Sequence, residues 1–126
     1  MTVPAAAERL VDVRHQLDSW ARRAGVAEAD REALTLATYE AMANVVVHAY
    51  PDGHGELRVE AVCLPGQGRV QVTVTDRGSW RTGGSGGGQW GGRGIPLIRA
   101  LAANVSIESG ARGTKVRMDW PWASAQ

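Results

Sequence analysis

Apolar residues in the first part of the chain recur with the period of an α-helix. A helix over residues 5–24 is predicted, because an apolar residue returns every three or four positions. Gly25 follows this stretch and is typical of a helix C-terminus. A second helix is predicted over residues 28–49, where three acids near the start favour a helix N-terminus and apolar residues supply a core face. The first 49 residues therefore predict a pair of helices.

The pattern then changes to the alternation of β-strands. Four strands are predicted, at residues 57–63, 70–74, 105–107 and 116–120. Turns at 65–68 and 110–113 would join them into two hairpins. A third helix is predicted over 95–103, with Pro96 in its first turn, where no amide donor is needed. These elements predict an α+β domain, a two-layer sandwich of three helices packed on one face of a mixed, mainly antiparallel sheet.

Composition narrows the class of protein. The chain has 126 residues, of which 44% are apolar, so we expect one globular domain over residues 1–126. A net charge of +1 lacks the basic excess of a general nucleic-acid binder. The one cysteine, Cys63, excludes an internal disulfide and a multi-cysteine zinc site. Neither a secretory signal nor a run of about 18 apolar residues is present. We therefore expect a cytoplasmic protein that binds no membrane and no nucleic acid directly.

Glycine is concentrated in one segment. Eight of the 16 glycines fall within residues 83–94, so residues 77–94 are not expected to form regular structure. The segment ends in Gly92-Arg93-Gly94, just before the third helix. Backbone amides without side chains at a helix N-terminus form an anion site, although a flexible loop has the same composition. A Walker A loop is excluded, because the only lysine is Lys115 and no Gly-Lys-Ser/Thr is present.

Three polar residues form a stripe on the second predicted helix. Glu40, Asn44 and His48 are spaced four apart in an otherwise apolar stretch. A solvated helix face is one interpretation. The other is a magnesium phosphate site, because such a site needs an oxygen ligand for the ion and a base beside it.

Two further motifs lie on the predicted strands. The strand that ends near residue 76 continues into Asp76-Arg77-Gly78, where the carboxylate would accept a hydrogen bond from a ligand amine and Gly78 would let a flat ring approach. Gly113-Thr114 opens the last predicted strand. Each motif alone is also typical of an ordinary turn.

Together, the four motifs resemble those of the GHKL (Bergerat-fold) ATPase superfamily. Residues 40–50, EAMANVVVHAY, resemble its N box, and the three glycine motifs resemble its glycine boxes in order and spacing. Within the superfamily the chain is most similar to the bacterial anti-sigma-factor serine/threonine kinases. The His-Ala-Tyr ending and the run GRGIPLIR at residues 92–99 carry that finer resemblance.

The resemblance implies a role for each matching residue. Asn44 would ligate the Mg²⁺ that bridges the ATP phosphates. Glu40 would be the catalytic general base for the hydroxyl of a serine or threonine in a partner protein. Asp76 would bind the adenine amino group, with Thr114 in the same network, and Gly78 would lie against the base.

The glycine-rich segment would be the lid over the nucleotide. Gly92 and Gly94 would let the lid and the amides of the third helix wrap the phosphates, and the lid would become ordered on binding. Two departures from the family pattern are present. Trp80 stands where a second glycine is usual, and no basic residue directly precedes the second glycine box. Arg81 or Arg93 would therefore have to reach the terminal phosphate.

The family also implies partners. They are a sigma factor, which is held away from RNA polymerase, an anti-anti-sigma factor of the STAS type as phosphorylation target, and a second copy in a homodimer. The alternative is a non-catalytic nucleotide-binding module that sequesters a regulatory partner. A histidine-kinase domain fits less well, because the chain has no Phe for the usual lid box. Glu40 and Asn44 also fit gyrase- and chaperone-type ATPases, but those enzymes need transducer domains that 126 residues cannot contain.

Overall fold

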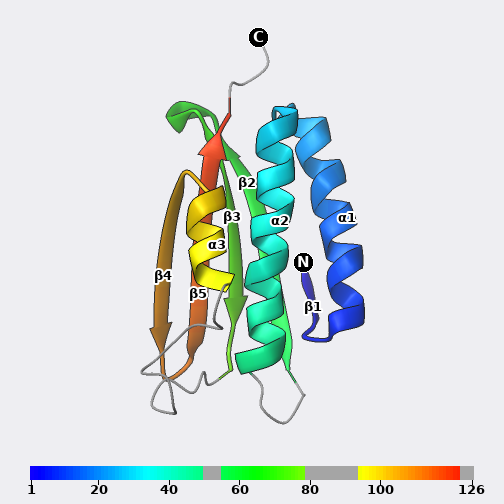
Figure 1. The fold of residues 1–126 in the computed structure, drawn as a ribbon, viewed down its shortest axis with the longest axis vertical. Coiled ribbons are helices and arrows are strands. Elements are labelled where there is room, and N and C mark those ends of the chain that lie inside the picture. The colour runs from blue at the N-terminus through cyan, green and yellow to red at the C-terminus, as the bar shows by residue number, and fades with distance from the viewer. Residues whose placement is uncertain (50–54, 79–93, 123–126) are drawn as a thin grey trace.

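Three helices cover one face of a five-stranded sheet in the computed structural model, which describes residues 1–49, 55–78 and 94–122 (Figure 1). The helices are α1 (Ala7–Ala24), α2 (Glu28–Asn44) and α3 (Gly94–Leu101), and a π-helical turn η1 (Val45–Ala49) continues α2. The strands are β1 (Thr2–Pro4), β2 (Glu56–Leu64), β3 (Arg69–Asp76), β4 (Asn104–Gly110) and β5 (Gly113–Pro121). The predicted α+β two-layer fold is confirmed.

The sheet has the strand order β1-β2-β3-β5-β4, and all four pairings are antiparallel. The expectation of a mixed sheet is therefore not met among the described strands. Both hairpins lie where the turns predict them. A 3₁₀ turn (Pro65–Gln67) and Gly68, with a φ of 65°, join β2 to β3.

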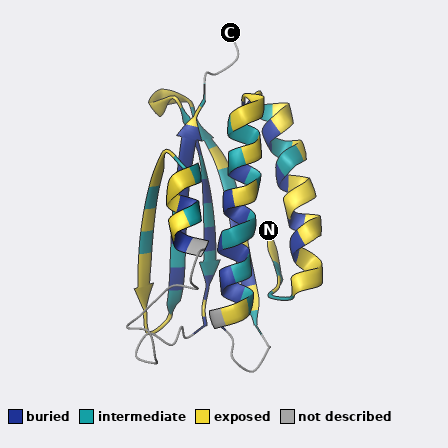
Figure 2. Cartoon of the chain, viewed as in Figure 1, coloured by how far each residue is buried: buried dark blue, intermediate teal, exposed yellow. Residues whose placement is uncertain are grey.

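Strand alternation places the core between the two layers (Figure 2). The buried residues of the central strand β3 are Val70, Val72, Val74 and Asp76. Residues between them are only half-buried, because they point to the face without helices. That face is polar, with Glu60, Thr73, Arg117 and Ser106 in one cross-strand row. The side chains of the sheet that point toward the helices are therefore the ones that reach the core.

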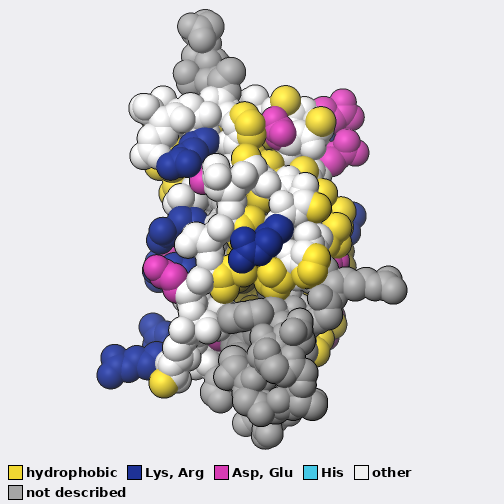
Figure 3. Space-filling view, turned by 60° about the vertical axis from the view of Figure 1, so that its left-hand side comes forward, with side chains coloured by type: hydrophobic (Ala, Val, Ile, Leu, Met, Phe, Trp, Pro, Cys, Tyr) yellow, Lys and Arg dark blue, Asp and Glu magenta, His cyan; other side chains and the backbone are white. Residues whose placement is uncertain are grey.

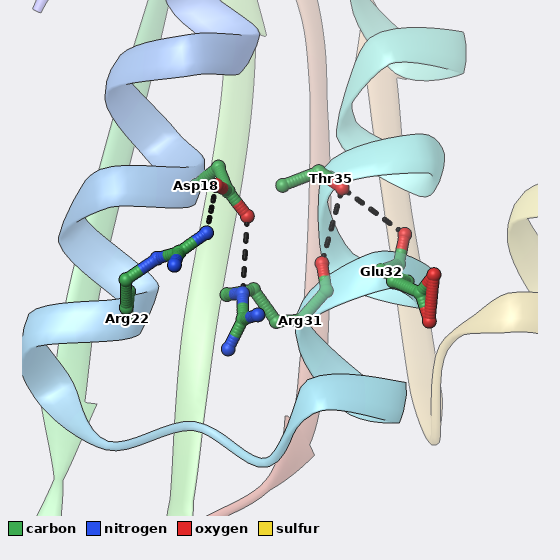
Figure 4. A network of polar contacts seen from close by, with 5 residues as sticks. All are labelled: Asp18, Arg22, Arg31, Glu32 and Thr35. Carbon is green, nitrogen blue, oxygen red and sulfur yellow. Dashed lines mark hydrogen bonds and ion pairs between the residues drawn. The ribbon is translucent and has the colours of Figure 1, made fainter.

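Charged contacts join α1 to α2 near their connection (Figure 4). Arg31 of α2 donates to Asp18 of α1 at 3.1 Å, and Arg22 reaches the same carboxylate at 3.3 Å. The Thr35 hydroxyl donates back to the carbonyl of Arg31 at 3.0 Å. These partly exposed pairs contribute little to stability, so the apolar contacts of α1 and α2 hold the helices together.

The C-terminal tryptophans correct one further expectation. From sequence, Trp120 and Trp122 near the end of the chain could form an exposed apolar patch. Trp120 is instead buried and donates its indole N–H to the Leu101 carbonyl at 2.9 Å, and the half-buried Trp122 donates to Ala24 at 2.8 Å. Both rings therefore tie the last strand to the ends of helices.

Candidate functional site

Asp76 and Thr114 lie side by side on neighbouring strands. Asp76 ends β3, Thr114 is the second residue of β5, and the two are partners in the antiparallel register. Both are buried on the helix-facing side of the sheet. Oδ1 of Asp76 accepts a hydrogen bond from the backbone N–H of Gly78 at 2.8 Å. This turn orients the carboxylate on the strand position next to Thr114.

Two glycines bring the backbone of three elements together at this end of the sheet. A Cβ on Gly78 would overlap the carbonyl oxygen of Ala49 and lie 2.7 Å from the Ala49 Cβ. Gly113 has a φ of 134°, and a Cβ there would lie 2.8 Å from the Cα of Arg77. Gly78 therefore holds the η1 turn against the end of β3, and Gly113 holds the start of β5 against it.

We expect Gly78→Ala to destabilise the domain by roughly 1–3 kcal/mol, because the added methyl group would have to displace the Ala49 backbone. Thermal or chemical unfolding measures this change. Gly66→Ala is the matched control, since no atom lies within 4 Å of a Cβ at that turn position. Equal stability of the two variants would show that the Gly78–Ala49 contact is not required.

Glu40 and Asn44 lie one turn apart on α2, immediately before η1. Asn44 is buried, with 7% of its surface exposed, and its Nδ2 has no hydrogen-bond partner in the part of the chain that the structure describes. A buried amide without a partner costs free energy, so native proteins seldom keep one without a use for it. An unpartnered N–H donor fits an acceptor such as a phosphate oxygen, whereas a metal ion would need the carboxamide oxygen of the same side chain.

Glu40 is only half-buried. The alternative to a general-base role is a structural carboxylate paired with an arginine, such as Arg99 or Arg9. Within the described ranges Glu40 forms no ion pair. Partial exposure explains this difference, because water solvates the carboxylate and desolvation demands no partner. The carboxylate is therefore accessible to an incoming group.

Some predicted site residues fall outside the described ranges. Arg81, Gly92 and Arg93 do so together with the rest of the lid, and so does the side chain of His48. Gly94 is the first residue of α3. Across the described part of the chain, no three His, Cys, Asp or Glu side chains gather into a metal-binding group.

Sequence reasoning missed the π-helical turn and its contact with Gly78. The run Val45-Val46-Val47 could have indicated it, because β-branched residues are unfavourable in α-helices and π-turns often mark functional sites.

Two hollows border Asp76 and Arg77. One, of about 490 Å³, includes the β4–β5 hairpin, and the other, of about 440 Å³, includes the start of β2.

The comparison with known families gives a direct assignment. The model of the histidine kinase-like ATPase domain matches residues 3–120. The chain belongs to this family. Asn44, Asp76 and Thr114 lie within the matched ATPase domain.

Individual relatives refine the assignment of this ATPase domain. It is 35% identical to the serine-protein kinase RsbW of Bacillus mycoides over 78 residues, which are 62% of the chain and 48% of the relative. The identity with RsbW of Bacillus thuringiensis and the two covered shares are the same. The chain thus spans about half the length of the curated relatives it matches.

Solved structures share the fold of this ATPase domain. The crystal structure of the RsbU and RsbW domains of Rv1364c from Mycobacterium tuberculosis aligns with a TM-score of 0.69 and 24% identity, over 100% of this chain and 34% of the other. The blue-light activated histidine kinase of Erythrobacter litoralis aligns with a TM-score of 0.65 and 22% identity, over 94% and 42% of the two chains. Both confirm the GHKL-type architecture.

None of the helices described in the structure has the length and apolarity to cross a membrane.

Proposed function

We propose that this ATPase domain is a serine/threonine protein kinase of the anti-sigma-factor type. It would bind Mg-ATP, sequester a sigma factor and phosphorylate an anti-anti-sigma factor. The observation that carries the proposal is the buried Asn44, whose Nδ2 has no hydrogen-bond partner among the described residues, one helical turn beyond the accessible carboxylate of Glu40. The similarity to RsbW kinases supports the same chemistry.

The residues divide the work between nucleotide and acceptor. Bound Mg-ATP would supply the transferable phosphoryl group, with its charge partly neutralised. Asn44 would hold the ion through its carboxamide oxygen. Glu40 would orient the acceptor hydroxyl and take its proton, which is the role of a general base in phosphoryl transfer. Neither residue needs to move far, because both lie on one helix face.

The adenine base of ATP would be recognised at the other side of the site. The Asp76 carboxylate accepts hydrogen bonds and would bind an exocyclic amino group, with Thr114 beside it. Gly78 would lie near the base, and the amides of Gly92 and Gly94 would face the phosphates. Arg81 or Arg93 would contact the terminal phosphate, as the lid composition implies. A base without an amino group could not donate a hydrogen bond to this buried carboxylate, which disfavours its binding.

Transfer of labelled phosphate tests the proposal. The purified domain is incubated with ATP labelled at the γ-phosphate and with the purified STAS-domain proteins encoded in the same genome. We expect magnesium-dependent label on a serine or threonine of one of them, and co-purification of a sigma factor with the domain. ATP binding without any transfer would instead identify the alternative, a non-catalytic module that sequesters its partner.

Assembly and location belong to the same proposal. We propose a cytoplasmic homodimer, as the family resemblance implies. Light scattering on the purified domain at several concentrations measures the dimer, and a monomer at all of them would contradict it.

A further inference from the structure

The outward side of α2 and η1 carries an apolar stripe. Six positions follow one another at spacings of 4, 3, 4, 3 and 4 and therefore share one helix face: Ala29, Ala33, Leu36, Glu40, Ala43 and Val47. Five of them are apolar: Ala29, Leu36 and Val47 are exposed, whereas Ala33 and Ala43 are half-buried against the core. Leu36 is 40% exposed and Val47 is 66% exposed. The candidate base is the only polar residue in the stripe.

This stripe differs from the side of α2 that faces α1. There Arg31 pairs with Asp18, and Arg14 of α1 lies over the Tyr39 ring at 5.8 Å from its centroid. Because α2 lies between α1 and α3, its outward face is covered by neither helix (Figure 1). An outward helix face is normally polar, so the exposed apolar side chains Leu36 and Val47 on either side of Glu40 indicate a binding surface.

The neighbouring helix α3 extends the surface. It packs beside α2, and Pro96 and Ala100 are exposed one turn apart on it. Hydrophobic side chains gather on the α3 side of the molecule around a basic side chain (Figure 3). Arg99 of α3 is exposed and forms no ion pair with any residue that the structure describes. The surface is thus apolar, with the Glu40 carboxylate in its stripe and the Arg99 guanidinium beside it.

We propose that this surface, formed by Leu36, Val47, Pro96 and Ala100 around Glu40, is the docking site for a helix of the phosphate-accepting protein. The inference rests on the proposed kinase function. A stripe at heptad-like spacing matches an amphipathic helix, and the unpaired Arg99 calls for an acidic residue on that helix. Leu36 and Val47 would then determine acceptor specificity.

The position of Glu40 selects this occupant. A partner that covers the stripe also covers the carboxylate, and only an acceptor that presents a hydroxyl there gives Glu40 a proton to accept. A second copy or a sequestered sigma factor on the same surface would block the acceptor.

Steady-state kinetics with the STAS-domain acceptor tests the docking site. We expect Leu36→Glu and Val47→Glu each to raise KM for the acceptor about tenfold or more, because a charge would replace an apolar contact. The kcat at saturating acceptor and the Kd for ATP should change little. Val62→Glu is the matched control, since this valine is 45% exposed on the other face of the sheet. Arg99→Glu should also raise KM.

The outcomes separate the two proposals. Transfer by the wild type with an unchanged KM in the Leu36 and Val47 variants would overturn the docking site and leave the kinase standing. Wild-type affinity of these variants for the acceptor, measured by calorimetry in a Glu40→Gln background, would overturn the docking site as well. If the wild type neither binds nor phosphorylates any STAS-domain protein of its genome, the kinase and the docking site both fall.

Discussion

Replacing Glu40 by glutamine should lower the rate of phosphoryl transfer to the acceptor at least about 100-fold, while the Kd for ATP changes only a few-fold. General-base catalysis by a positioned carboxylate contributes roughly 10²–10⁴-fold. Glutamine keeps the size and position of the side chain but cannot accept the proton. Since Glu40 is half-buried and forms no ion pair within the described ranges, the substitution should leave stability nearly unchanged.

The control for this experiment lies on the same helix. Glu32→Gln removes an exposed carboxylate two turns earlier and should leave both transfer and ATP binding at wild-type levels. Turnover of Glu40→Gln near the wild-type rate would show that another group, or none, acts as the base. A large loss of ATP affinity would show instead that Glu40 belongs to the nucleotide site.

Asn44→Ala should weaken ATP binding roughly 10–100-fold in magnesium and only slightly in the presence of a chelator, because the carboxamide would act through the ion. Calorimetry under the two conditions gives the comparison. The stability of the free domain should not fall, since alanine removes a buried Nδ2 that has no partner. This combination would distinguish a ligand-binding asparagine from a structural one.

A second buried polar atom supplies the control. The Thr38 hydroxyl is fully buried on the same helix and also has no hydrogen-bond partner. Thr38→Val removes it with little change of shape and should leave ATP binding unchanged in both conditions. An equal loss of affinity for Asn44→Ala with and without magnesium would contradict its role as a metal ligand.

The fold was accessible from sequence where the apolar pattern is local. The helices and both hairpins follow from periodicity and turn residues, and Gly25 ends α1 with a φ of 84° as expected. β1 was missed because three residues that include Pro4 carry no period of their own. They form a strand only by pairing with β2, a contact across more than 50 residues of chain.

For the candidate site, the spacing of motifs selected residues but not their geometry. It placed Asp76 and Thr114 in one network, and the strand register shows that they are neighbours, while their roles stay predictions. Sequence could not show that Gly78 approaches Ala49, because that contact depends on how η1 and β3 pack. It also could not show that Glu40 is only half-buried. Tertiary packing decides both.

Calorimetric titration of ATP into the purified domain, with and without Mg²⁺, tests the central claim most directly. The account predicts binding of about one ATP per chain that depends on magnesium. It also predicts that binding is lost when Asp76 is replaced by alanine. No detectable heat of binding in a sample shown to be folded by circular dichroism would contradict the nucleotide site and, with it, the kinase.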